Sequence, residues 1–103
     1  MHTENSYVTL TYSDENLPEN LSLDIRDFQL FMKRLRKAVE PDRIKVFYCG
    51  EYGEENGRPH FHACLFGKDF LDKVFFKMLN GNRLYTSDEL LGLWQKGHVT
   101  IGD

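Results

Sequence analysis

The chain has 103 residues, a formal net charge of −3, 41% hydrophobic residues and 14% aromatic residues. This length allows one small domain, residues 1–103, and excludes a membrane protein with spanning helices, because no apolar run approaches the length of a bilayer span. The N-terminus lacks the basic and apolar regions of a secretory signal, and the two cysteines form no dense pattern, so we expect a reduced, cytoplasmic protein.

Charge is unevenly distributed along the chain, which bears on the class of partner. Residues 1–27 carry six acidic residues and one basic residue, whereas residues 28–50 carry two acidic and six basic ones: Lys33, Arg34, Arg36, Lys37, Arg43 and Lys45. The negative net charge argues against a protein that binds nucleic acid over its whole surface. A local basic patch can still bind phosphate, because exposed charges more than about 10 Å apart are largely screened at ordinary salt.

The first predicted element is a strand at residues 7–12, "YVTLTY", which alternates and is rich in β-branched residues. The alternation predicts two faces, one with Val8, Leu10 and Tyr12 and the other with Tyr7, Thr9 and Thr11. Turn residues follow, including Pro18.

A helix is predicted next, capped by Ser22 or Asp24 and running to about Val39. Either residue type can cap a helix N-terminus, and Pro41 ends the helix. Apolar residues recur at helical spacing and predict its buried stripe: Ile25, Phe28, Phe31, Met32, Leu35 and Val39.

Two further strands, residues 44–52 and 59–66, are predicted to form a hairpin. Asn56-Gly57 is the strongest turn signal between them. The region 68–85 is ambiguous, apart from a turn at residues 80–82.

A short helix and a last strand complete the predicted fold. Thr86 or Ser87 caps the helix and Gly97 ends it, and residues 98–102 form the strand. The order β-α-β-β-α-β predicts an α+β domain with a ferredoxin-like antiparallel sheet and helices packed on one face.

The predicted hairpin brings polar side chains together. If Tyr52 lies opposite Pro59, then Glu51 lies opposite His60 and Cys49 opposite His62. This register gives one apolar face for the helices to cover and leaves the histidines on the open face. A slip of one residue would move Glu51 to the wrong side of the sheet.

Glu51, His60 and His62 form a candidate site for a divalent metal. A His-x-His pair on a strand points both imidazoles the same way, and a neighbouring carboxylate completes a typical donor set. Such a site keeps positions open for water or a phosphate oxygen, as catalysis requires. One alternative is a structural zinc site formed by the histidines with Cys49 or Cys64.

A second alternative is a non-catalytic nucleic-acid-binding domain of the same topology, in which the histidines only stack or form hydrogen bonds. Exposed aromatic residues would then serve as stacking platforms, and Phe47 and Phe66 are the candidates.

Several motifs in order resemble a known family: "YVTLTYSDENLP", "LFMKRLRK", "FYCGEYG", "RPHFHACLFG" and "SDELLGLWQKGHVTIGD". The chain is similar along nearly its whole length to the replication initiators of microviruses, the small single-stranded-DNA phages. These initiators belong to the HUH endonuclease superfamily, named for a His-hydrophobe-His motif.

The resemblance implies that the protein starts rolling-circle replication by nicking one DNA strand at the origin. His60 and His62 match the metal-binding histidines, and Glu51 matches the position that commonly supplies a third ligand, with Mg²⁺ or Mn²⁺ as the ion. Single-stranded origin DNA is the implied partner, beside host replication proteins. Candidate contacts to DNA are Thr9, Thr11, Lys45 and Arg58.

The chain departs from the family pattern in its nucleophile. The family's tyrosine lies on a helix after the last strand, in a Tyr-x-x-x-Tyr motif, so we expect it beyond Asp103, the last residue of this sequence. Tyr85 is the least unsuitable substitute within residues 1–103. We therefore expect the chain to be the N-terminal part of a longer initiator, able to bind metal and DNA without forming the covalent adduct.

Overall fold

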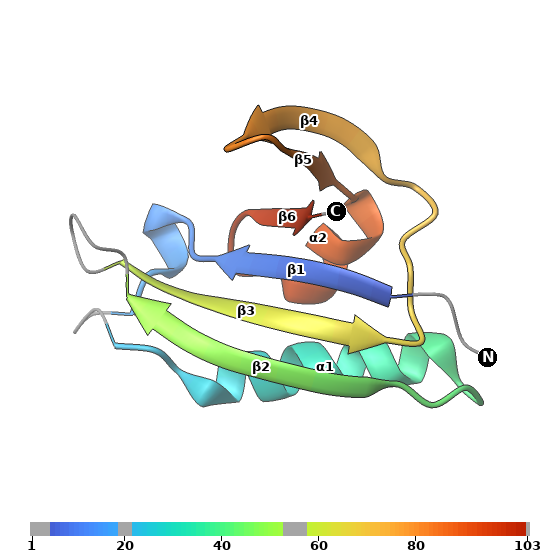
Figure 1. Ribbon diagram of the computed structural model, residues 1–103. Helices are drawn as coiled ribbons and strands as arrows, with labels where there is room; N and C mark the ends of the chain where they lie inside the picture. Colours follow the sequence, from blue (N-terminus) through green and yellow to red (C-terminus); the bar gives the residue numbers. More distant parts are fainter. Residues whose placement is uncertain (1–4, 19–21, 53–57, 103) are drawn as a thin grey trace.

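A six-stranded antiparallel sheet forms the body of the computed structural model, which describes residues 5–18, 22–52 and 58–102 (Figure 1). The strands are β1 (Asn5–Thr11), β2 (Lys45–Tyr52), β3 (Pro59–Phe66), β4 (Val74–Leu79), β5 (Asn82–Thr86) and β6 (Val99–Gly102). They lie side by side in the order β2-β3-β1-β6-β5-β4. The predicted α+β class is therefore confirmed.

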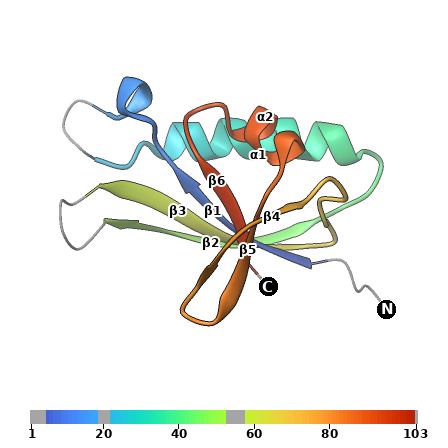
Figure 2. The same cartoon turned by 90° about the horizontal axis from the view of Figure 1, so that it is seen from above.

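Two α-helices, α1 (Ile25–Val39) and α2 (Asp88–Trp94), cover the same face of this sheet, as Figure 2 shows. A short 3-10 helix, η1 (Asp14–Asn16), follows β1. Among the described residues, no helix is both long and apolar enough to cross a lipid bilayer. The face of the sheet opposite the helices stays open, as the alternation of the strands predicted.

Helix α1 begins at Asp24, whose side chain accepts a hydrogen bond from the backbone N–H of Arg26. Its buried stripe consists of Phe28, Phe31, Met32 and Leu35, as predicted. The prediction was wrong for Ile25, which is exposed because it lies in the first turn, beyond the edge of the core.

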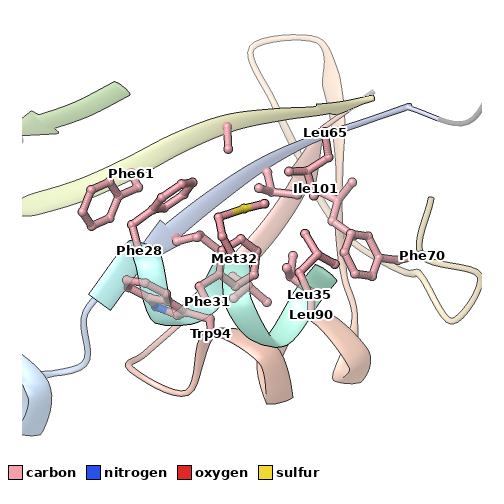
Figure 3. Packing of buried hydrophobic residues seen from close by; sticks show 14 of the residues in the cluster. Phe28, Phe31, Met32, Leu35, Phe61, Leu65, Phe70, Leu90, Trp94 and Ile101 are labelled. Atoms are coloured by element: carbon pink, nitrogen blue, oxygen red, sulfur yellow. The ribbon is translucent and has the colours of Figure 1, made fainter. Parts of the chain in front are cut away.

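The core lies between the sheet and both helices, and aromatic rings fill its centre (Figure 3). Trp94 is fully buried and meets Phe31, Phe61 and Tyr12 edge-to-face. Its indole N–H donates a 2.7 Å hydrogen bond to the carbonyl of Thr11, so the only polar atom of the ring is satisfied. This ring joins α2 to α1 and to β1.

The ambiguous region after β3 contains the hairpin of β4 and β5. All six residues of β4 are exposed, and its pairing with β5 shifts between Phe75 and Lys77. The turn has positive φ angles at Asn80 and Gly81, as a two-residue hairpin loop requires. The predicted turn here is confirmed, whereas the Asn56-Gly57 turn lies outside the described residues.

Helix α2 is capped by Ser87, which accepts a hydrogen bond from the N–H of Leu90. The prediction that Gly97 ends this helix was wrong, because Gln95 adopts the left-handed conformation, with φ 64°, and ends it earlier. Gly97 instead lies against the backbone of Thr11 and Ser13, where a Cβ atom would overlap both residues.

Replacing Gly97 with alanine is expected to destabilise the domain by about 1–3 kcal/mol, because backbone rather than a flexible side chain must move to admit the methyl group. Gly92→Ala in α2 is the matched control, since a Cβ there meets no heavy atom within 4 Å. The control should leave stability unchanged or raise it by up to about 1 kcal/mol. Urea unfolding of the two variants measures both effects, and equal stabilities would refute this close approach.

Candidate metal centre

Strands β2 and β3 pair in the predicted register. Glu51 lies opposite His60, and Cys49 lies opposite His62. Tyr48 points to the helix side, where its ring stacks on Phe28 with centroids 4.1 Å apart. Because successive side chains alternate, Glu51, His60 and His62 share the open face.

The three side chains converge on one point. Glu51 Oε2 lies 3.1 Å from His62 Nε2 and 3.4 Å from His60 Nε2. The three ligand atoms all lie within 4.8 Å of one another. Ligand bonds of about 2.1 Å to one ion place neighbouring donors about 3 Å apart, so this donor set fits a divalent cation.

The second nitrogen of each imidazole is also held. His60 Nδ1 lies 3.3 Å from the carbonyl of Arg58, and His62 Nδ1 lies 3.1 Å from Thr9 Oγ1. A carbonyl only accepts hydrogen bonds, so His60 carries its proton on Nδ1 and leaves the Nε2 lone pair directed at the site. Partners of this kind orient metal-binding histidines and raise their basicity.

Replacing Thr9 with valine is expected to weaken Mn²⁺ binding by about tenfold, because His62 loses the hydroxyl that orients its ring. Thr100→Val is the control, since Thr100 is the cross-strand neighbour of Thr9 on β6. Isothermal titration with MnCl₂ measures both affinities. An equal affinity for the two variants would show that the Thr9 hydroxyl has no orienting role.

Tyr7 stacks on His62, with ring centroids 5.7 Å apart and an angle of 10° between the planes. Burial, followed by the neighbouring Cys64, Cys49 and Glu51 groups, raises the pKa of Tyr7. The phenol therefore stays neutral near pH 7, and the ring serves as a platform for the imidazole. The sequence placed Tyr7 on this face without a role; its position beside Thr9 and opposite Cys64 was the signal.

The candidate DNA contacts lie at different distances from this site. Thr9 touches it, and Thr11 lies opposite His60 while its hydroxyl donates to the carbonyl of His98. Lys45 shares the open face but lies at the far end of β2, six residues from Glu51, or about 20 Å along the strand.

Arg58 lies near His60, but its guanidinium is bound within the chain. It forms a 2.6 Å ion pair with Asp14 and donates to the carbonyl of Tyr12. These contacts hold the segment after β1 against the start of β3.

Tyr85 lies on the face of the sheet opposite the candidate site. It pairs with Ile101, which is buried under the helices, and its ring meets Phe75 edge-to-face. The geometry thus removes Tyr85 as a substitute nucleophile. The predicted position of the family's tyrosine, beyond Asp103, lies outside the described residues, as does Asp103 itself.

The cysteines do not join the ligand cluster. Among the described residues, the only group of three or more metal-binding side chains is Glu51, His60 and His62. Cys49 and Cys64 are free thiols on the same face, beside the cluster. This separation disfavours the structural zinc site.

Aromatic side chains extend the open face away from the imidazoles. Phe47 and Phe66 are 68% and 41% exposed and meet edge-to-face, with centroids 5.7 Å apart. A hollow of about 240 Å³ lies between Phe47, Tyr7 and His62. The open face therefore has exposed rings at one end and the carboxylate with two imidazoles at the other.

Residues 5–103 match the model of a protein family described as replication-associated protein ORF2. The chain belongs to this family. The matched residues include the whole sheet and all three members of the Glu51, His60 and His62 cluster, so the candidate site lies within the replication-associated domain.

Curated relatives of this replication-associated chain come from microviruses, as the motifs predicted. The chain is 34% identical to replication-associated protein ORF4 of Chlamydia phage 1, over 99% of this chain and 27% of that protein. The identity is 34% with VP4 of Bdellovibrio phage phiMH2K, over 99% and 35%. It is 37% with ORF2 of Spiroplasma virus 4, over 96% and 33%. The chain therefore spans about a third of these relatives, and a comparison with solved structures finds no match.

Proposed function

We propose that this chain is a HUH endonuclease domain that nicks single-stranded DNA to start rolling-circle replication of a small phage genome. The observation that carries the proposal is the convergence of Glu51 with His60 and His62 on the open face of the sheet. Membership of a replication-associated family supports a role in phage replication. Such a protein would act in the cytoplasm of the bacterial host.

The fold supports this assignment at the level of strand order. Without the β4–β5 hairpin, the sheet reads β2-β3-β1-β6, with every described pairing antiparallel. We propose that this four-stranded unit is the ferredoxin-like core and that the hairpin is an addition to one edge.

Glu51, His60 and His62 would hold the divalent cation, which we propose to be Mg²⁺ or Mn²⁺. When bound, such a cation polarises a phosphate oxygen as a Lewis acid. The Arg58 carbonyl and the Thr9 hydroxyl would keep the two imidazoles in the ligating orientation.

Single-stranded DNA is proposed to run along β2 and β3 on the open face. Bases would stack on Phe47 and Phe66 and reach the hollow beside Tyr7, while Lys45 meets the backbone phosphates at the distal end. Base–aromatic stacking contributes about 1–3 kcal/mol per base and tolerates any sequence. This path would bring a phosphodiester to the carboxylate and imidazoles.

The proposed reaction is an exchange of one phosphodiester bond for another. A tyrosine oxygen bonds to the phosphorus, the bond from phosphorus to the 3′ oxygen breaks, and the phenolic proton passes to that 3′ oxygen through water. The products are a 5′-phosphotyrosyl link and a free 3′-hydroxyl. As the resemblance implies, we propose that the attacking tyrosine comes from outside the described residues.

The test uses the complete product of the gene that encodes this chain, with single-stranded oligonucleotides tiled across the genome that carries the gene. One oligonucleotide should be cut in Mn²⁺ or Mg²⁺, and the fragment on the 3′ side of the cut should migrate with the protein in a denaturing gel. His62→Ala and Glu51→Gln should abolish the cut, whereas Cys49→Ser and Cys64→Ser should retain it.

Three outcomes would reject the nickase. Cleavage that persists in EDTA would exclude the metal. DNA binding without any cleavage, unchanged by His62→Ala, would favour a non-catalytic binding domain. Cysteine-dependent zinc binding, with unfolding by a chelator, would favour a structural zinc site.

A further inference from the structure

An apolar groove lies on the helix side of the molecule, between α1 and strand β2. Its volume is about 700 Å³, within the range of ligand-binding clefts. Phe28, Met32, Val46 and Tyr48 form its apolar lining. Since Val46 and Tyr48 point away from the open face, the groove lies on the opposite side of the sheet from Glu51 and the histidines.

The groove borders an unprotected sheet edge. Strand β2 pairs only with β3 and ends the sheet on this side, so every second residue directs its N–H and C=O groups outward. Natural edge strands are usually guarded by prolines, bulges or central charges. The opposite edge, β4, has a register shift and a central Lys77, whereas β2, "KVFYCGEY", has no proline and no charge between Lys45 and Glu51.

The far end of β2 is already covered. Leu23 packs against Gly50 so closely that a Cβ on this glycine would overlap the leucine side chain, and the N–H of Leu23 donates to the Tyr52 hydroxyl. The open stretch of edge is therefore residues 45–49, which runs alongside the apolar groove.

Basic side chains line the outer wall of the groove. Lys33, Arg36 and Lys37 border it from α1, with Glu40 as the single acidic residue of the lining. Within the described parts of the chain, these three cations form no ion pair. Arg34, by contrast, is bound to the carbonyls of Leu93 and Trp94 and serves the packing of α1 on α2.

We propose that residues 45–49 and this groove bind an extended acidic peptide of a partner protein by strand addition. The peptide backbone pairs with the β2 edge, alternate apolar side chains enter the groove, and acidic side chains meet Lys33, Arg36 and Lys37. A free strand edge recognises a peptide backbone, which nucleic acid lacks. This site is independent of the metal centre, because the two lie on opposite faces of the sheet.

The probe is a display library of random 12-residue peptides, selected on the immobilised 103-residue chain. Enriched peptides should carry apolar residues at every second position, with acidic residues around them. The combined substitution Lys33→Glu, Arg36→Glu and Lys37→Glu should weaken a synthesised enriched peptide by at least about tenfold in fluorescence polarisation. The matched control is Arg26→Glu, Lys77→Glu and Arg83→Glu, which changes net charge equally at exposed positions outside the groove.

Strand addition is tested on the peptide itself. N-methylation at alternate residues in one phase should abolish binding, and N-methylation in the other phase should reduce it much less, because only one set of N–H groups faces β2. The proposal fails if no peptide is enriched, if the groove variant binds as well as the control, or if both phases behave alike. It also fails if single-stranded oligonucleotides lose affinity for the groove variant and displace the peptide. Each failure leaves Mn²⁺ binding and DNA cleavage unchanged, so the proposed nickase is tested separately.

Discussion

Replacing Glu51 with glutamine is expected to weaken Mn²⁺ binding by about 100-fold or more. The amide keeps the shape of the side chain but loses the charge and the anionic oxygen that lies 3.1 Å from His62 Nε2. Loss of an outer-shell partner alone typically costs about 10–100-fold in metal affinity, so loss of a direct ligand should cost at least the upper value. Isothermal titration of the 103-residue chain with MnCl₂ measures the effect.

Two controls accompany this titration. Glu40→Gln removes an acid of the same type at the end of α1, outside the ligand cluster, and should leave Mn²⁺ affinity unchanged. Cys49→Ser should also bind normally, since its thiol is not part of the cluster. Retained affinity in Glu51→Gln with loss in Cys49→Ser would overturn the donor set and favour a thiolate site.

Replacing Trp94 with alanine is expected to destabilise the domain by about 3–5 kcal/mol, as large-to-small changes of buried aromatic residues do. The ring is fully buried, contacts three aromatic neighbours and satisfies the Thr11 carbonyl. Small domains have only about 5–15 kcal/mol of stability, so this variant should be close to unfolded at 25 °C. Urea unfolding followed by circular dichroism measures the loss.

A second variant keeps the measurement interpretable if Trp94→Ala does not fold. Trp94→Phe retains an aromatic ring but removes the N–H donor, and it should cost about 1–3 kcal/mol. Leu91→Ala on the same helix is the control, because Leu91 is 44% exposed, and it should change stability by about 0.5 kcal/mol or less. A cost for Leu91→Ala equal to that for Trp94→Ala would mean that the ring does not form the centre of the core.

The hairpin that carries the candidate site could be predicted because its two faces differ chemically. Residues 46 and 48 on β2 and 61, 63 and 65 on β3 are apolar, so a single register buries them together and leaves Glu51 beside His60. Helix α1 was predictable for the same reason, since its apolar residues repeat at helical spacing. In both cases the burial of one face decides the structure.

The β4–β5 hairpin could not be assigned in this way. All six residues of β4 are exposed, so no difference in burial imposes alternation on the sequence, and the register shift after Phe75 breaks the period further. The end of α2 was misplaced because Gln95 adopts a positive φ that is usually left to glycine, while Gly97 is required by close backbone contact. The stacking of Tyr7 on His62 depends on side-chain orientation, which strand alternation does not specify.

The central claim is that Glu51, His60 and His62 together hold one divalent cation. The most direct test is a crystal structure of the chain grown or soaked with MnCl₂, with anomalous scattering used to locate manganese. We predict one strong anomalous peak about 2.0–2.3 Å from a Glu51 carboxylate oxygen and from Nε2 of both histidines. A peak bound instead by Cys49 or Cys64, or a fully ordered site without manganese at saturating concentration, would contradict the claim.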